Sequence, residues 1–311
     1  MTNKMPTRQA AEPPWNVEFG LDLTRQPKWN IPELVVIEAA IVGHPIKRTT
    51  NPHHPYTPDE IRKEAMECID AGAVAVHLHP RTDEGDPIND PDEYIGKMRR
   101  IIEPIREKYG DRVVIDGCDL LSTFEAEEEL IKTGLLETSP VNAFYRSPSK
   151  LLQAETRMMQ KHGVKPQIAL YSDGDLDRAM QWLIETNIPE KPLYWIYLPS
   201  YLMGGTPLPN EFAMVESLMW QVRRIREIDP GSIIMVCGSG RASSYLTNMA
   251  MLLGLHVRVG MEDSIYRWPH RDDLIDSNAN VVSETIKIAK ALGRRPATAN
   301  EFRALLGLPT R

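Results

Sequence analysis

Residues 72–80 read GAVAVHLHP, and this stretch decides the fold that we expect. A glycine is followed by a short valine-rich run, then by two histidines and a proline. Short apolar runs of this kind, bounded by glycine and proline, predict a buried strand. The preceding residues 58–71 have helical periodicity and begin at 57–60, TPDE, where a capping hydroxyl comes before proline and two acids. A second helical segment follows at 91–108.

The same order of a short strand and a longer helix repeats along the chain. We expect strands at Leu34–Ile41, Val74–His79, Val113–Asp116, Leu135–Thr138, Gln167–Tyr171, Tyr194–Leu198, Ile233–Cys237 and His256–Gly260. We expect helices at Pro58–Ala71, Pro91–Lys108, Thr123–Thr133, Ser149–His162, Asp175–Thr186, Glu211–Ile228, Ser243–Leu253 and Ala279–Leu292. Repeated strand–helix units predict a parallel sheet with right-handed crossovers, and eight such units fit a closed (β/α)8 TIM barrel.

An open doubly wound sheet is the main alternative to the barrel. That fold places a glycine-rich dinucleotide loop after its first strand. Here the loop at 42–45 reads VGHP, and the chain contains no GxGxxG. We therefore expect a single barrel domain over residues 31–311, preceded by an N-terminal extension over residues 1–30. The extension is polar and rich in proline; it is either partly disordered or packed on the barrel or on a neighbouring subunit.

Composition narrows the classes of protein that fit. The chain has 311 residues and a formal net charge of -7, which disfavours a nucleic-acid partner because such proteins favour a basic surface. Cys68, Cys118 and Cys237 form no CxxC pair, so neither a disulfide framework nor a cysteine zinc site is expected. The sequence shows neither a signal-peptide apolar region nor an apolar run of about 20 residues, and we expect a cytoplasmic protein with no membrane partner.

His77 and His79 are the strongest local sign of a functional site. Side chains two residues apart on a strand point to the same side, so both imidazoles project together at the carboxyl end of their strand. Active sites of barrels lie at that end. Two converging imidazoles suit a divalent metal, zinc first, although ligand type alone does not separate zinc from other divalent metals. The alternative is a pair of hydrogen-bonded interior histidines.

A second sign lies at residues 256–263, HVRVGMED, where an apolar strand runs into two acids. In a closed barrel the eighth strand adjoins the first, and the first adjoins the second. Glu262 then lies near enough to the histidine pair to be a third ligand, and two histidines with one carboxylate leave positions open for substrate. The alternatives are that Glu262 and Asp263 are solvated loop acids and that Arg258 forms an interior ion pair with one of them.

Glu38 and Asp116 are acids within or at the end of apolar strands. A charge in such a place must be paired or lie in a functional cavity. We assign Glu38 to the catalytic group and Asp116 to substrate binding. For Glu38 an interior salt bridge with Arg258 is the alternative, and metal ligation is a weaker option. Three further histidines in the first loop are not expected to be ligands: His44, His53 and His54.

Gly240 and Arg241 end the run GSGR at 238–241, directly after the seventh strand. Barrels often bind phosphate at the loops after strands seven and eight. Small residues free backbone amides for an anion, and the arginine adds positive charge. We expect these two residues to bind a phosphate of a ligand; the alternative is an ordinary tight turn with a surface arginine. The long loop at 199–209 is expected to be an active-site insertion.

Taken together, these segments resemble the β-keto acid cleavage enzymes over about residues 34–308. The matching pieces are EAAIVG at 38–43, AGA at 71–73 leading into HLH at 77–79, YSDG at 171–174, GR at 240–241, HVRVGMED at 256–263, SNA at 277–279, LGR at 292–294 and AT at 297–298. The set is specific, whereas any single piece would not be. The resemblance implies a zinc-dependent barrel enzyme that condenses a β-keto acid with acetyl-CoA and releases acetoacetate and a new CoA ester.

The resemblance also implies roles for individual residues. It places the metal on the two histidines and the glutamate described above. It places a base on Asp263 and, on Arg258, the arginine that positions this base. It adds Thr138, at the end of the fourth strand, as a site residue. Members of the family usually form homotetramers.

Two departures from the family pattern bear on the substrate. The best-known members carry a glutamate that holds a substrate amine two residues after the glycine at the first strand's exit, where this chain has Pro45. Members often carry a serine just past the third strand; the match here is Cys118, which we keep as a candidate catalytic residue. Both changes argue against an amino-keto substrate. The glycine-rich turn after the sixth strand is enlarged, and its Gly204 and Gly205 are candidates for binding substrate or CoA.

Two other kinds of protein stay open. One is a metal-dependent hydrolase or lyase of a small carboxylated metabolite on the same barrel. The amidohydrolase type has its His–x–His pair on the first strand and more histidines on middle strands, whereas this chain has the pair on the second strand and none on the middle strands. The other is a non-catalytic metal- or metabolite-binding barrel, which would leave Asp263 and Arg258 without a task.

Overall fold

Eight parallel strands close into a barrel in the computed structural model, which describes residues 25–43, 46–117, 123–144, 147–200 and 205–311. In barrel order they are β2 (Ile37–Ala40), β3 (Ala75–Leu78), β4 (Val114–Gly117), β5 (Thr138–Asn142), β6 (Lys165–Leu170), β7 (Tyr194–Tyr197), β8 (Ile233–Val236) and β9 (His256–Val259). Pairing of β9 with β2 closes the ring. The predicted (β/α)8 barrel is confirmed.

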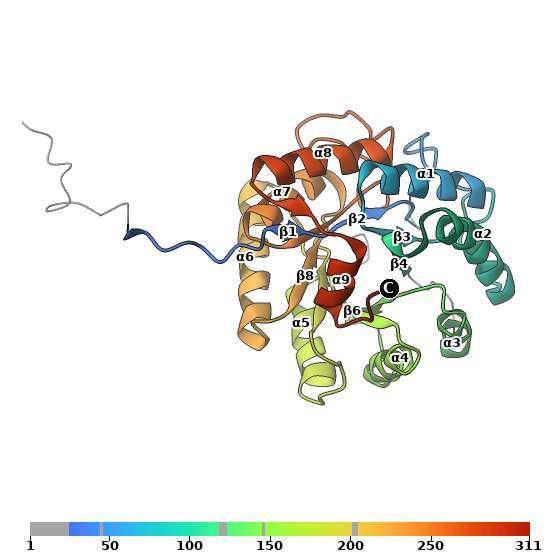
Figure 1. The fold of residues 1–311 in the computed structure, drawn as a ribbon, viewed down its shortest axis with the longest axis horizontal. Coiled ribbons are helices and arrows are strands. Elements are labelled where there is room, and N and C mark those ends of the chain that lie inside the picture. Colours follow the sequence, from blue (N-terminus) through green and yellow to red (C-terminus); the bar gives the residue numbers. More distant parts are fainter. Residues whose placement is uncertain (1–24, 44–45, 118–122, 145–146, 201–204) are drawn as a thin grey trace, which may run out of the picture. The chain divides into compact units, whose positions relative to one another are not determined.

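Helices connect the strands and surround the barrel (Figure 1). They are α1 (Pro58–Ala71), α2 (Pro91–Tyr109), α3 (Phe124–Lys132), α4 (Ser149–Lys161), α5 (Asp173–Ala179), α6 (Glu211–Ile228), α7 (Ser243–Leu252) and α8 (Asn278–Ala291). A π-helical turn, Met180–Ile184, continues α5. Thr57 caps α1, because its hydroxyl accepts from the Glu60 amide at 3.3 Å.

The first predicted strand, Leu34–Ile41, divides into two. β1 (Leu34–Val35) leaves the barrel and pairs with β10 (Arg295–Pro296), while β2 continues inside the ring. Between them the Val36 amide donates to His256 Nδ1 at 3.1 Å, so a side chain interrupts the backbone ladder at this point.

The fourth strand of the barrel starts later than the sequence predicts, which places it at Leu135–Thr138. β5 begins at Thr138 and runs to Asn142, with Pro140 in register with Gln167 of β6. A proline argues against a central strand because it lacks an amide hydrogen, yet β5 accommodates it. Thr138 therefore opens its strand rather than ending it, and it pairs in register with Asp116 of β4.

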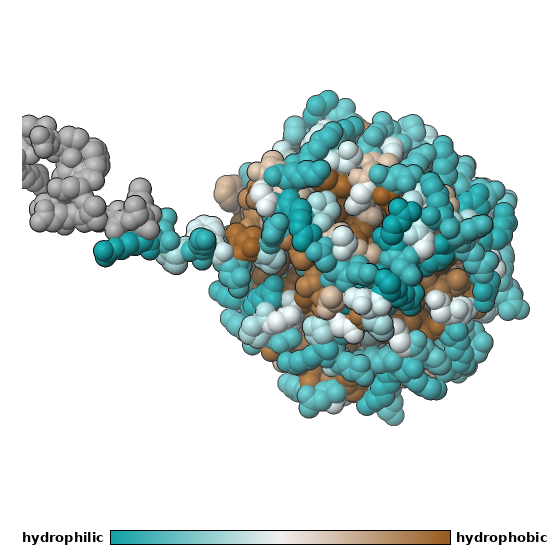
Figure 2. Space-filling view, in the orientation of Figure 1, coloured by the Kyte–Doolittle hydropathy of each residue, from teal (hydrophilic) through white to brown (hydrophobic). Residues whose placement is uncertain are grey.

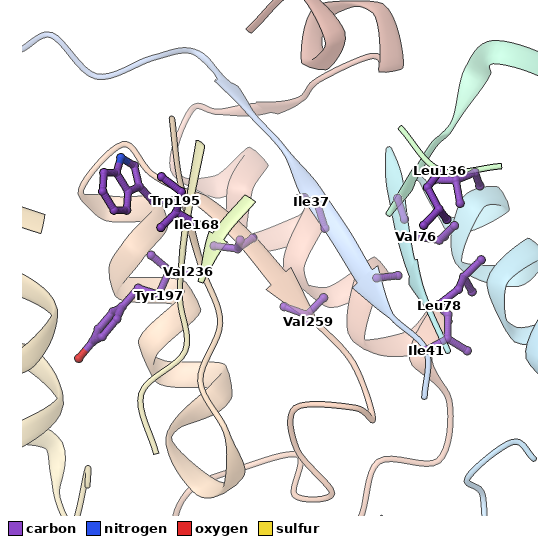
Figure 3. Close-up of a cluster of buried hydrophobic side chains, with 14 of the residues drawn as sticks. Ile37, Ile41, Val76, Leu78, Leu136, Ile168, Trp195, Tyr197, Val236 and Val259 are labelled. Atoms are coloured by element: carbon purple, nitrogen blue, oxygen red, sulfur yellow. The ribbon is translucent and has the colours of Figure 1, made fainter. Parts of the chain in front are cut away.

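Two apolar layers hold the barrel. Successive side chains of a strand point to opposite faces, so strands such as β3, β4 and β7 contribute to both layers. Figure 3 shows part of the outer layer, in which Ile37 and Val76 lie between strands and helices with Trp195 and Val236. The inner layer fills the barrel's amino-terminal half with Val36, Ala75, Val114, Tyr194 and Met235. Both layers are nearly inaccessible to solvent.

The ninth helix, α9 (Ala299–Leu306), lies at the barrel's amino-terminal end (Figure 1). Its Phe302 and Leu306 join the inner layer, and the Phe302 ring lies 6.0 Å from the Tyr194 ring. Arg303, fully buried, donates to the Glu137 carboxylate at 2.6 and 3.0 Å.

In the orientation of Figure 1, Figure 2 shows a surface that is mainly hydrophilic, with hydrophobic residues scattered between the hydrophilic ones. The opposite end, formed by the carboxyl ends of the strands, is the catalytic end.

The chain divides into two units, Met1–Ile31 and Pro32–Arg311, and the barrel belongs to the second. Residues 1–24 lie outside the described residues, so the fate of the predicted N-terminal extension stays a prediction. Of the helices in the described part of the chain, none is long and apolar enough to span a bilayer.

Phe302→Ala tests whether the packing of α9 against the inner layer stabilises the barrel. Phe302 is fully buried, so its loss leaves a cavity in the inner layer and should lower the free energy of unfolding by about 3–5 kcal/mol. Phe212→Ala is the matched control; Phe212 is 72% exposed, and a change within about 0.5 kcal/mol is expected. Urea denaturation measures both variants. Equal midpoints for the two would contradict this account of α9.

Candidate metal centre and active site

Strand pairing brings distant parts of the sequence to one edge of the barrel. β2 lies between β3 and β9, with Ala40 paired to His77 and Glu38 paired to Arg258. Because all three strands are parallel, their carboxyl ends meet at the catalytic end. His77 and His79, at the carboxyl end of β3, and Glu262 and Asp263, after β9, therefore face the same space.

Two glycines let the chain that carries Glu262 turn inward after β9. Gly260 has a φ of +145°, and a Cβ there would lie 2.1 Å from the Ala40 carbonyl oxygen. At Gly43 a Cβ would lie 2.5 Å from Glu262 Cγ. A side chain at either position would push Glu262 away, so the close approach depends on glycine.

Three ligand atoms converge at this point. His77 Nε2 lies 3.0 Å from His79 Nε2, and Glu262 Oε1 lies 3.2 Å from the first and 3.5 Å from the second. Bonds of about 2.1 Å to one cation, at octahedral or tetrahedral angles, separate neighbouring ligand atoms by about 3.0–3.4 Å. Among the described residues, Glu262 Oε2 has no hydrogen-bond partner. These buried side chains fit a divalent metal with open positions for substrate.

Asp116 and Thr138 orient His77. The ring Nδ1 of His77 forms a short hydrogen bond with Asp116 Oδ2, and the Thr138 hydroxyl donates to the other carboxylate oxygen of Asp116. A proton on Nδ1 leaves the Nε2 lone pair pointing at the metal position. Such a carboxylate–histidine pair is common around protein-bound metals, where it fixes the tautomer and makes the ligand more basic.

The charges around the cluster favour a cation. Burial lowers the pKa of His77, but the carboxylates of Glu262 and Asp116 outweigh burial and raise this pKa to about 10. Burial raises the pKa of Glu262, but the positive charges of His77, Arg258 and His79 hold it well below its usual range. The carboxylates thus attract positive charge, which either a proton or a metal ion can supply.

Arg258 and Asp263 form a buried, bidentate ion pair beside the ligand atoms. Arg258 Nη2 donates to Asp263 Oδ1 at 2.6 Å, and its Nε donates to Oδ2 at 3.1 Å. The same Nη2 lies 3.4 Å from Glu262 Oε1. Burial and the Glu262 charge raise the pKa of Asp263, while Arg258 acts in the opposite direction. The arginine therefore fixes the direction of the carboxylate next to the metal position.

Glu38 lies deeper in the barrel, two residues before Ala40 on β2. Among the described residues, neither of its carboxyl oxygens has a hydrogen-bond partner, and no ion pair within 4.0 Å joins it to Arg258. Burial and the charge of Asp116 raise its pKa to about 8, so the carboxyl group is mostly protonated at neutral pH. Its oxygen lies within 4.8 Å of ligand atoms of His77 and Asp116.

Two polar side chains of the same interior were missed from the sequence, Gln167 on β6 and Tyr194 on β7. Both are buried in the barrel, and burial with the charges of Glu38 and Asp116 raises the pKa of Tyr194 far above its usual value. Gln167 interrupts an apolar strand as Glu38 does, and that signal could have found it. Tyr194 gives no such signal, because tyrosine is common in strands.

Gly240 and Arg241 lie beside the site rather than in it. The Gly240 amide donates to the Asp263 carbonyl oxygen at 2.8 Å. The Arg241 side chain is 44% exposed, pairs with Asp272 and lies 3.8 Å over the Tyr266 ring.

The remaining residues singled out in the sequence lie in loops or outside the described chain. Gly205 lies in the loop after β7, His53 is exposed and His54 is buried in the first loop. The predictions for Cys118, Gly204, His44 and Pro45 fall outside the described residues.

The fold and the site define a barrel protein with a candidate metal-dependent active site at its catalytic end. A model of the beta-keto acid cleavage enzyme family matches residues 34–308. The chain belongs to this family of enzymes.

Curated relatives match most of the chain. A 3-keto-5-aminohexanoate cleavage enzyme from Fusobacterium nucleatum subsp. nucleatum is 30% identical over 286 residues, which cover 89% of this chain and 98% of that protein. A 3-oxoadipate:acetyl-CoA acetyltransferase from Cupriavidus necator is 26% identical over 88% of this chain and 95% of its own length. The solved structure of ObcA with oxaloacetate has a TM-score of 0.64 at 18% identity and covers 83% of this chain and 68% of its own, a likeness of fold alone.

Asp116→Asn tests whether the carboxylate on His77 supports metal binding. Loss of the negative charge makes His77 a weaker ligand, so metal affinity should fall by about 10–100-fold. Competition with a chromogenic chelator measures the affinity. Asp59→Asn, at an exposed position on α1, is the control and should bind metal as the wild type does. Unchanged affinity in Asp116→Asn would contradict the orienting role.

Proposed function

We propose that this enzyme condenses a β-keto acid with acetyl-CoA and releases acetoacetate and a new CoA ester, with a divalent metal, zinc, held by His77, His79 and Glu262. One observation carries the proposal: the bidentate Arg258–Asp263 pair lies directly beside the three converging ligand atoms. A metal position and an oriented carboxylate are the two parts that proton removal next to a ketone requires.

The names of relatives support acetyl-CoA as the second substrate. The Cupriavidus necator protein is named a 3-oxoadipate:acetyl-CoA acetyltransferase. A protein from Rhizobium meliloti, 25% identical over 89% of this chain and 97% of its own length, is named a 3-dehydrocarnitine:acetyl-CoA trimethylamine transferase. Both names join a keto compound to acetyl-CoA, which agrees with a site that must accept two substrates.

In this proposal the chemistry begins at Asp263. Its carboxylate takes a proton from the carbon between the ketone and the carboxylate of the keto acid. Arg258 holds both carboxylate oxygens, and this contact sets the direction of proton transfer. When bound, the metal supplies Lewis-acid stabilisation of the negative charge that grows on the ketone and carboxylate oxygens.

The following steps exchange acyl groups without an external oxidant or reductant. The carbanion attacks the thioester carbonyl of acetyl-CoA and forms a new carbon–carbon bond. The CoA sulfur then moves to the original ketone carbon within the adduct. Cleavage of the bond between that carbon and its neighbour gives the new CoA ester, and the leaving carbanion takes back a proton to give acetoacetate. The proton that Asp263 removed is thus returned.

A requirement for acetyl-CoA separates this reaction from hydrolysis. We expect the purified, zinc-loaded enzyme to release acetoacetate from at least one member of a panel of β-keto acids only when acetyl-CoA is present. A chelator should abolish turnover and added zinc should restore it. Liquid chromatography with mass spectrometry detects acetoacetate and the new CoA ester together. Consumption of a keto acid at the same rate without acetyl-CoA would overturn the proposal in favour of a hydrolase or lyase.

Asp263→Asn tests the base. The amide keeps the size of the side chain but cannot accept the substrate proton, so kcat should fall by about 10²-fold or more while zinc remains bound. Metal content by mass spectrometry confirms that the ligands are intact. The matched control is Asp273→Asn, a partly exposed aspartate that pairs with Arg271 on the loop after β9 and should keep wild-type activity. Full activity in Asp263→Asn would assign proton removal to another group.

A further inference from the structure

A cavity opens at the catalytic end of the barrel beside the loop that carries Arg241. Its volume is about 560 Å³, within the range that holds small ligands. Parts of three loops, those that follow β7, β8 and β9, form it together with α6 and α7. The lining includes Leu208, Met214 of α6, Arg241, Tyr245 of α7, Pro269 and His270. Because these loops follow the carboxyl ends of neighbouring parallel strands, the cavity lies at the same end as the metal position.

A short backbone link joins this cavity to the candidate base. Gly240 precedes Arg241 of the cavity wall, and its amide donates to the Asp263 carbonyl oxygen at 2.8 Å. The hydroxyl of the neighbouring Ser239 is buried and has no hydrogen-bond partner among the described residues. The cavity wall at Arg241 is therefore one residue away from a direct backbone contact with Asp263.

Arg241 supplies the positive charge among the described residues that line the cavity. Its guanidinium is stacked over Tyr266 at 3.8 Å, and its Nη1 donates to the Arg271 carbonyl oxygen at 2.8 Å, so its plane is fixed. Its anionic partner Asp272 has a side chain that is 89% exposed, and exposed ion pairs of this kind contribute little to stability. A phosphate group is a stronger partner for arginine because it forms charge-assisted, bidentate hydrogen bonds.

Two rings beside Arg241 offer a surface for a planar group. The Tyr245 and His270 rings lie 6.2 Å apart, and the tyrosine hydroxyl is 3.3 Å from His270 Nδ1. Tyr245 is 41% exposed, so part of its ring is accessible to a ligand. Aromatic faces next to a cation are the combination that binds a nucleobase and its phosphates.

We propose that this cavity binds the phosphorylated adenosine end of acetyl-CoA, with Arg241 on a phosphate and the Tyr245 and His270 rings against the adenine. The inference rests on the proposed function, since it assigns a place to the second substrate of that reaction. Glu211 and Asp272 add negative charge at this rim, so binding requires Arg241 to leave Asp272 for the phosphate. The thioester end then extends past Gly240 to Asp263.

Arg241→Gln tests the phosphate contact. Loss of one charge-assisted contact should raise the KM for acetyl-CoA about 10-fold or more, with a smaller effect on kcat. With acetyl-pantetheine, which lacks the adenosine and its phosphates, the variant and the wild type should have the same KM. Asp272→Asn should act in the opposite direction and lower the KM for acetyl-CoA, because it frees Arg241.

Arg295→Gln is the matched control. Arg295 is similarly exposed, at 46%, and pairs with Glu301, but it lies on β10, which pairs with β1 outside the barrel. The KM values of Arg295→Gln for acetyl-CoA and for acetyl-pantetheine should equal those of the wild type. An unchanged KM for acetyl-CoA in Arg241→Gln, in an enzyme whose turnover requires acetyl-CoA, would overturn the inference and leave the proposed function standing.

Direct binding separates the remaining outcomes. Isothermal titration of the zinc-loaded enzyme with CoA should show weaker binding to Arg241→Gln than to the wild type or to Arg295→Gln. If the wild type neither binds CoA nor uses acetyl-CoA, the inference and the proposed function both fail. An equal rise in KM for acetyl-CoA and for acetyl-pantetheine in Arg241→Gln would show a general defect of the variant. That result would also overturn the assignment of Arg241 to a phosphate.

Discussion

The attraction of buried carboxylates for positive charge is the interaction on which this site depends. Asp116, Glu262 and Asp263 are each at most 4% exposed. Asp116 and Glu262 both contact His77, and Arg258 lies beside both Glu262 and Asp263. Placing an unpaired carboxylate in such surroundings costs several kcal/mol. Arg258 compensates Asp263, and positive charge on His77, from a proton or from the proposed metal ion, compensates the other two. The carboxylates therefore favour a positive charge at the histidines, and the proposed metal ion is one way to supply it.

The rest of the fold keeps this charge cluster rigid and dry. The outer apolar layer holds the strands against their helices (Figure 3), and the inner layer with α9 fills the other end of the barrel. Water is thus kept away from the cluster on the amino-terminal side, which strengthens each electrostatic interaction. Gly43 and Gly260 add the close backbone approach that brings Glu262 over the end of β2. Substrates can reach the cluster from the catalytic end, where loops differ among barrels.

Local sequence patterns predicted the parts of the site that follow from strand geometry. The alternation of side chains on a strand was enough to bring His77 and His79 together, and closure of the barrel was enough to add Glu262. Side-chain contacts between distant parts of the chain, which change where strands begin and end, could not be predicted in the same way. The single-residue interruption at Val36 depends on His256, more than 200 residues away, and the displaced start at Thr138 depends on pairing with Asp116. The exposed position of Arg241 depends on Asp272 and Tyr266, to which its own loop gives no signal.

The position of the metal tests the account most directly. Crystals of the zinc-loaded protein, measured on both sides of the zinc absorption edge, locate the ion without reference to the protein chain. The account predicts one strong anomalous peak about 2.0–2.2 Å from Nε2 of His77, from Nε2 of His79 and from a carboxylate oxygen of Glu262. A peak at another group of residues, or zinc-loaded crystals in which the two imidazoles point away from each other with no ion between them, would contradict it.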